Sequence, residues 1–144
     1  MSESAVQELF RRAVRESDAE AFREGIELLF AHGSPESLSP EAEFALRHED
    51  YVMEMPQSGE RIRTREAMRA MQEAFPVPPS STLRRVVGAG GMWVVEGVND
   101  YEGDVWHLIV VLELDRDGRI VRDTRYYTRA FEAPEWRAEW VEQM

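Results

Sequence analysis

The sequence contains no lysine, no cysteine and no long apolar run. Without lysine the chain cannot form a Schiff base, and it lacks the lysine of a phosphate-binding P-loop. Without cysteine it has no disulfide, no thiolate nucleophile and no cysteine-ligated zinc. No apolar stretch reaches the roughly 18 residues that a membrane span needs, and the first ten residues lack the apolar core of a signal peptide. We therefore expect a cytoplasmic protein of bacterial type.

Positive charge is also scarce, because 17 arginines face 28 acidic residues and the net charge is −11. Most of this excess negative charge lies in the first half, where residues 1–60 hold 14 acids and 5 arginines. Such a surface repels phosphate groups, and no basic stripe with interspersed aromatic residues is present. We expect neither nucleic acid nor anionic membrane as a partner. The acidity is interpreted as a solvated surface that keeps the protein soluble.

A length of 144 residues with 43% apolar content predicts one domain, 1–144, with one core. Helical patterns occupy the first half. Ser4 and Ser17 are each followed three residues later by Gln or Glu, the form of a capping box, and apolar residues then recur at helical spacing. Further helices are predicted to begin near Pro40 and Thr64.

The second half has the period of β-strands. Glu102-Gly103 and Asp115–Gly118 are typical of hairpin turns. A terminal helix is predicted over Pro134–Gln143, with Trp136 and Trp140 used for packing. Helices followed by an antiparallel meander indicate an α+β fold. The predicted strands are Tyr51–Met55, Glu60–Arg63, Leu83–Val87, Met92–Tyr101, Val105–Leu114 and Arg119–Arg129.

Three short motifs are interpreted as structural. Residues 88–91 are glycine-rich but join two strands, so they do not form a dinucleotide-binding loop. Asp115-Arg116-Asp117-Gly118 resembles the start of a calcium loop, yet Tyr126 stands where that loop needs a glutamate. The three histidines lack metal-ligand spacing, so we expect no metal site and no cofactor. They are His32, His48 and His107.

Alternation along the strands predicts an apolar inner face. A two-residue turn at Glu102-Gly103 pairs Asn99 with Trp106. A four-residue turn at Asp115–Gly118 brings three polar side chains to the same face, whereas a three-residue turn would reverse them. Those three are Asp123, Arg125 and Tyr127. The apolar wall comprises Trp93, Val95, Trp106, Leu108, Val110 and Leu112.

Two interpretations of the polar trio stay open. An acid, an arginine and a tyrosine beneath an apolar wall are typical of a ligand pocket. Alternatively, Asp123 and Arg125 form a pair that only neutralises itself inside the fold. Both satisfy the rule that buried charge needs a partner.

Three segments, Pro56–Met68 (PQSGERIRTREAM), Gly91–Ile120 and Arg125–Glu142, resemble the nuclear transport factor 2-like superfamily, within it the SnoaL-like branch with its polyketide cyclases. The resemblance spans nearly the whole chain. It implies helices packed into a strongly curved, cone-shaped sheet of the cystatin-like α+β roll type, with a ligand cavity and commonly a homodimer through the sheet. It implies no single chemistry.

The resemblance also places residues relative to enzymes of this fold. Met55 stands where steroid isomerase-like relatives have their base, and Val110 where they have their oxyanion-hole acid. Gly97, Asn99 and Arg125 stand at the three positions that activate water in limonene epoxide hydrolase-like relatives. Neither residue set is therefore present. Tyr51 and Glu54 lie beside the cavity mouth in relatives.

We predict a protein that binds a small apolar, oxygenated molecule, with two functions open. One is cofactor-independent acid–base catalysis of the polyketide cyclase kind, with Asp123 as the base (Glu54 is a weaker candidate) and Arg125 and Tyr127 as donors. The other is binding without catalysis. The expected ligand contacts are Tyr51, Glu54, Met55, Trp93, Asn99, Trp106, Leu108 and Val110.

The opposite face of the sheet is too apolar for water, and the helices can cover only one side. We therefore predict a homodimer through this outer face. His107, Glu96 and Glu113 share the face as interface polar groups. Its apolar members are Val94, Val98, Val105, Ile109 and Val111.

Overall fold

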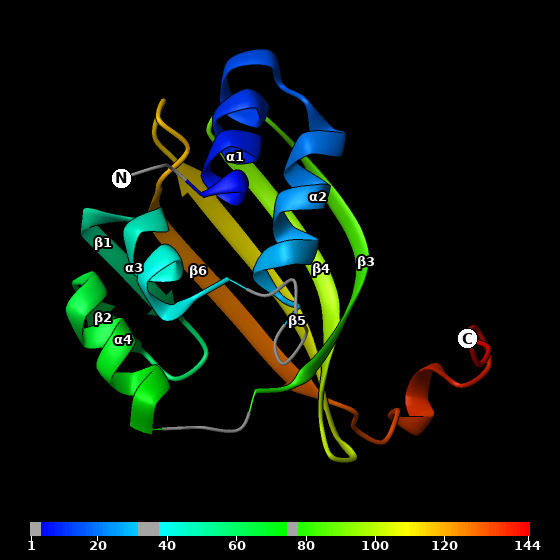
Figure 1. The fold of residues 1–144 in the computed structure, drawn as a ribbon. Coiled ribbons are helices and arrows are strands. Elements are labelled where there is room, and N and C mark those ends of the chain that lie inside the picture. Colours follow the sequence, from blue (N-terminus) through cyan, green and yellow to red (C-terminus); the bar gives the residue numbers. More distant parts are fainter. Residues whose placement is uncertain (1–3, 32–37, 75–77) are drawn as a thin grey trace.

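A computed structural model describes residues 4–31, 38–74 and 78–144. They form an α+β fold, as predicted, in which helices cover one face of a curved sheet and leave the other face open (Figure 1). None of the described helices is both long and apolar enough to cross a membrane.

The first two helices, α1 (Ala5–Glu16) and α2 (Ala19–Leu29), pack side by side on the sheet. Ser4 caps α1 as predicted, because its hydroxyl accepts from the amide of Gln7 at 3.1 Å. The predicted cap of α2 was wrong. Asp18 caps that helix, whereas Ser17 ends α1 in a left-handed conformation and accepts a hydrogen bond from the amide of Gly90.

Aromatic stacking holds these helices to the sheet. The ring of Phe22 lies between those of Phe10 and Trp93, at centroid distances of 4.9 and 4.6 Å. All three side chains are fully buried. The Trp93 indole donates to the carbonyl of Gly90 at 2.7 Å, so its polar atom is satisfied.

Two shorter helices stand beside the first sheet edge. Pro40 opens α3 (Pro40–Leu46), and Ser39 caps it. Thr64 precedes α4 (Arg65–Ala74) and accepts from the amide of Ala67. Both helices begin where the sequence predicted them.

The sheet has the strand order β2-β1-β6-β5-β4-β3, and β1 and β6 run parallel while the other pairs are antiparallel. The parallel pair joins the first strand to the last. The strands are β1 (Arg47–Met55), β2 (Glu60–Arg63), β3 (Ser80–Ala89), β4 (Met92–Tyr101), β5 (Asp104–Leu114) and β6 (Ile120–Arg129).

The register between β4 and β5 is as predicted, with Asn99 opposite Trp106 and Trp93 opposite Leu112. The two-residue turn between them has positive φ at Glu102 and Gly103. This backbone twist suits a tight hairpin.

Between β5 and β6 the inner face is as predicted, but the loop reaches it differently. Leu114 pairs with Ile120, and continuing that register would turn Asp123 outward. A bulge next to this pair shifts the register, so Leu112 lies opposite Asp123. Asp123, Arg125 and Tyr127 consequently share one face with Leu108 and Val110.

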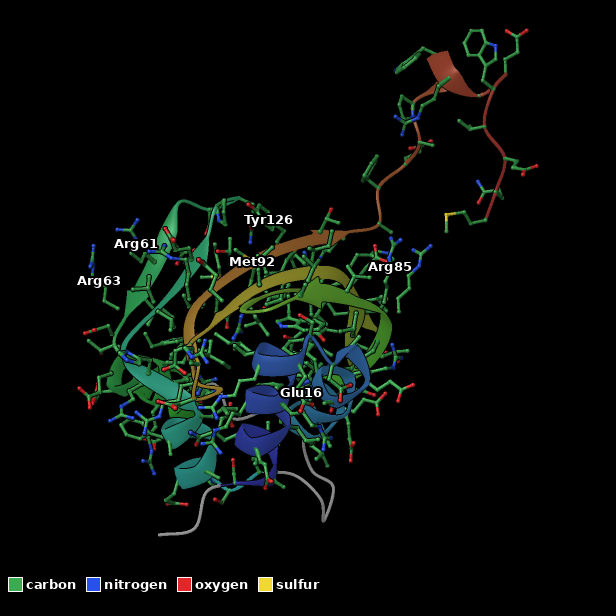
Figure 2. The ribbon with its side chains drawn as sticks, turned by 90° about the horizontal axis from the view of Figure 1, so that it is seen from above. Glu16, Arg61, Arg63, Arg85, Met92 and Tyr126 are labelled. Carbon is green, nitrogen blue, oxygen red and sulfur yellow. The ribbon has the colours of Figure 1, made fainter. Side chains whose placement is uncertain are left out.

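The predicted terminal helix is absent. Beyond β6 the chain forms only a short 3-10 turn, η1 (Glu135–Arg137). The segment runs away from the body of the molecule (Figure 2). Trp136 and Trp140, which were predicted to serve packing, are each 74% exposed and do not pack against the body of their own chain. A helix of this length is marginal in water unless its apolar face packs on something.

Candidate functional site

A cavity of about 650 Å³ lies between the helices and the inner face of the sheet. Its volume is within the usual range for small-molecule sites, about 300–1,000 Å³. Helices α2, α3 and α4 form one wall, and strands β3 to β6 form the other. Most of the lining is apolar, and it includes Leu29, Phe30, Leu38, Phe44, Met68, Met71, Leu108, Val110, Leu112 and Ile120.

The carboxylate cluster, formed by Tyr51, Asp123 and Arg125, lies largely buried at this cavity. Asp123 is 3% exposed. Arg125 donates through Nε to both carboxylate oxygens, at 3.0 and 3.1 Å, and through Nη2 to Oδ2 at 2.7 Å. The fully buried Tyr51 donates its hydroxyl to Oδ2 at 3.1 Å. The carboxylate is thus occupied by an arginine and a phenol.

Electrostatics fix the protonation states of this cluster. Burial raises the pKa of the Tyr51 hydroxyl well above its ordinary value, and the charge of Asp123 raises it further. Burial alone would lower the pKa of the Arg125 guanidinium, but the Asp123 carboxylate outweighs this and raises it well above the ordinary value. Tyr51 therefore stays a neutral donor and Arg125 stays charged.

A second group, the helix-side cluster, comprises Glu43, Arg47 and Gln72. Oε1 of Glu43 accepts from Arg47 Nη2 at 3.0 Å and from Gln72 Nε2 at 2.8 Å. Arg47 is 4% exposed, its Nε has no hydrogen-bond partner among the residues that the structure describes, and its guanidinium lies 5.3 Å from the Tyr51 ring centroid. Sequence reasoning missed this cluster, although Glu43 and Arg47 stand four residues apart at the end of a predicted helix.

Further polar groups come from β3, β4 and β6. Ser81 donates to the side-chain oxygen of the buried Asn99 at 2.8 Å. Tyr101 and Tyr127 also line the cavity, and burial raises the pKa of Tyr101. On these strands the polar lining outside the two clusters consists of neutral donors and acceptors, whereas α4 adds the charged pair of Arg69 and Glu73.

The structure brings together six of the residues predicted for the site. They line the cavity from three adjacent strands: Asn99, Leu108, Val110, Asp123, Arg125 and Tyr127. Tyr51 does not line it but holds Asp123 from behind. The chemical roles assigned to Asp123, Arg125 and Tyr127, as base and donors, stay predictions.

Four predicted contacts lie elsewhere. Trp93 is core, stacked on Phe22, and Trp106 packs edge-on against Tyr127 without reaching the cavity. Met55 packs at the margin of the core. Glu54 points to the other side of the sheet, because strand alternation opposes it to the inward-facing Met53, and it pairs with the arginines of positions 61 and 122.

No group of three His, Asp or Glu side chains able to hold a metal ion occurs in residues 4–31, 38–74 and 78–144.

Comparisons with known proteins were made for both sequence and structure. No family model matches the chain, and no curated protein does. Among solved structures, an NTF-2 like protein of unknown function from Burkholderia xenovorans LB400 is 28% identical, with a TM-score of 0.65. The alignment covers 96% of this chain and 98% of that one.

Two further neighbours are enzymes by description. A proposed ketosteroid isomerase from Kribbella flavida DSM 17836 is 24% identical over 97% of this chain and 90% of its own, with a TM-score of 0.68. An LEH-like epoxide hydrolase of M. tuberculosis is 19% identical over 72% and 79%, with a TM-score of 0.58. At these identities the likeness is one of fold.

Proposed function

By its fold this chain belongs to the nuclear transport factor 2-like superfamily, and from that premise we propose that it binds a small, mostly apolar molecule carrying an oxygen acceptor in the cavity. The observation that carries the proposal is Arg125, a charged donor that Asp123 holds in the strand wall of the cavity, opposite Val110. A cavity of this size with few convergent polar groups is typical of a ligand site.

Arg125 is positioned to recognise an oxygen atom. A guanidinium has five N–H donors, and the contacts with Asp123 use those of Nε and Nη2. The remaining donors serve a carbonyl or carboxylate of the ligand, with Tyr127 and Asn99 lining the same space. Because Asp123 holds the guanidinium in place beforehand, little side-chain entropy is lost on binding.

Binding without proton transfer is favoured over acid–base catalysis. Asp123 accepts hydrogen bonds from Arg125 and Tyr51, so abstracting a proton from a substrate requires breaking them first. Acid–base catalysis of the polyketide cyclase kind stays the second candidate, because Asp123 is a carboxylate in the cavity wall and two neighbours carry enzyme names. A cytoplasmic location is part of the proposal.

The experiment compares two matched double variants against a panel of steroids, terpenoids and aromatic polyketides. Asp123→Asn with Arg125→Leu removes the cavity pair without leaving a buried charge. Asp104→Asn with Arg129→Leu removes an exposed pair, 2.8 Å apart, where β5 and β6 meet. Ligand-induced shifts of the melting temperature should show at least tenfold weaker affinity for the cavity variant and wild-type affinity for the exposed-pair variant. Equal affinity of both would refute the proposal.

Mass spectrometry of the incubated compounds separates the two candidates. Binding alone predicts that each bound compound is recovered unchanged. Conversion by the wild type that is lost in Asp123→Asn would establish the catalytic alternative instead.

A further inference from the structure

Residues 130–144, here called the C-terminal tail, leave the sheet at the end of β6 and do not fold back onto it. Figure 2 shows them extending away from the helices, on the side of the sheet that carries Met92 and Tyr126. In the described structure, the hydrogen bonds of the segment beyond Ala130 join its own residues, such as Ala138 to Glu135 and Trp140 to Arg137. The tail is therefore not anchored to its own body.

The tail carries apolar groups that a solvated terminus does not need. Phe131, Trp136 and Trp140 are each 74% exposed, and Val141 is 53% exposed. An aromatic side chain of this kind buries about 150–250 Å² when it packs. Several exposed aromatic side chains on one segment indicate a surface that binds another protein surface.

The outer face of the sheet offers a complementary surface. A shallow hollow of about 240 Å³ lies over β3, β4 and β5, lined by Arg85, Val87, Val94, Glu96 and Ile109. Val87 and Ile109 are 50% and 42% exposed there. The residues around it that are likewise open to solvent are Met92, Val105 and Tyr126.

We infer that the tail of one molecule docks on the outer sheet face of a second copy of this chain. Charge supports this occupant, because the tail has four glutamates and one arginine while Arg84 and Arg85 stand exposed beside the hollow. Glu96 pairs with both arginines and neutralises one of the two positive charges, so one positive charge remains in excess. A reciprocal exchange therefore brings opposite charges together.

Area supports it as well. Burying three aromatic side chains per tail removes roughly 450–750 Å² from water, and two tails double this before the covered faces are counted. The total reaches the 1,200–2,000 Å² of a stable interface. Fifteen residues extend to about 50 Å, which is enough to reach across a neighbouring sheet. This inference does not depend on the cavity or its ligand.

The absence of cysteine makes a direct test possible, since any introduced thiol is the only one in the chain. Protein with Ala138→Cys is mixed with protein carrying Val87→Cys and oxidised mildly. We expect a mixed disulfide between the two proteins. The matched control is Glu16→Cys, at an exposed position on α1 on the helix side of the sheet, which should not cross-link to the tail (Figure 2). Equal cross-linking to both positions, or to neither, overturns the inference.

A second measurement uses sedimentation velocity over a concentration series. Changing Trp136→Ser and Trp140→Ser together should raise the dimer dissociation constant at least tenfold, whereas Phe at both positions should change it less than threefold. An unchanged constant for the Ser variant overturns the inference. A third variant carries both Ala138→Cys and Val87→Cys in one chain. A disulfide that forms within this chain, and not between two chains, also overturns the inference, because the tail then folds onto its own sheet.

Discussion

A carboxylate as buried as Asp123 is stable only while its partners remain. Arg125→Leu removes the arginine and leaves the Asp123 carboxylate with the Tyr51 hydroxyl as its hydrogen-bond donor among the described residues. We expect a loss of roughly 3 kcal/mol in the free energy of unfolding, measured by denaturant titration. Adding Asp123→Asn to that variant should recover more than half of the loss, since the stranded charge is then gone. No recovery would show that the pair does not carry the effect.

Tyr51 gives the protein a specific sensitivity to alkali. Its pKa is raised in the folded state, so the folded protein holds a proton that the unfolded chain releases near the ordinary value of 10.0. The contribution of Tyr51 is complete below pH 10 and is lost progressively as the pH rises above it. Tyr51→Phe should flatten the fall in stability above pH 10 in urea titrations. Tyr126→Phe, which removes an exposed phenol from the outer face, is the matched control for the loss of a hydroxyl.

Tyr51→Phe should also weaken the fold at neutral pH. The change removes one donor from a buried carboxylate, for which a loss of about 1–3 kcal/mol is expected. Thermal unfolding at pH 7 measures it. A melting temperature equal to that of the wild type would mean that water or another donor replaces the phenol.

At the scale of single residues, alternation along β4 to β6 was sufficient to place Asp123 and Arg125 together on the inner face. It could not supply Tyr51. That contact spans 72 residues and depends on a parallel pairing of β1 with β6. Local patterns in a sequence carry no information about which distant strands become neighbours.

Among the elements, the β5–β6 loop fits closely against α1. Gly118 has a φ of 82°, and a Cβ there would lie 2.5 Å from the Gln7 carbonyl oxygen and 2.6 Å from the Arg11 amide nitrogen. Gly118→Ala therefore meets both backbone strain and the backbone of α1. We expect a loss of more than about 2 kcal/mol, read from urea unfolding.

Gly59→Ala is the matched control for that change. Its φ of 74° is similar, but no atom of the described part of the chain lies within 4 Å of the added Cβ. It should lose only the strain component, roughly 1 kcal/mol. Equal losses at the two glycines would contradict a packing role for the loop.

The same loop shows how far element prediction reaches. The sequence predicted a four-residue turn, and the inner face came out as expected, yet the pairing of Leu114 with Ile120 needs a bulge to restore that face. A bulge leaves no composition signal here. The tail shows the opposite failure: the spacing of Trp136 and Trp140 suits a helix, but spacing alone cannot supply the surface that a short helix needs.

For the whole molecule, we expect a homodimer that uses the outer face. Ile109 is 42% exposed near the centre of this face, and Ile109→Arg places a charge where the two copies meet. Light scattering should show the dissociation constant raised at least tenfold, or about 1.4 kcal/mol. Glu16→Arg, on the helix side, should leave it unchanged (Figure 2). A wild type that stays monomeric at micromolar concentration would contradict the prediction.

The parallel pairing of β1 with β6 has a consequence for the order of events in biosynthesis. The hairpins β3–β4 and β4–β5 join neighbouring stretches of chain, so they can form early and locally. Strand β1 is made long before its partner and cannot take its place in the sheet until residues 122–124 have left the ribosome. Until then the sheet against which the helices of the first half pack is incomplete, so their apolar faces stay exposed to solvent. The cavity is therefore the last part of the molecule to be completed.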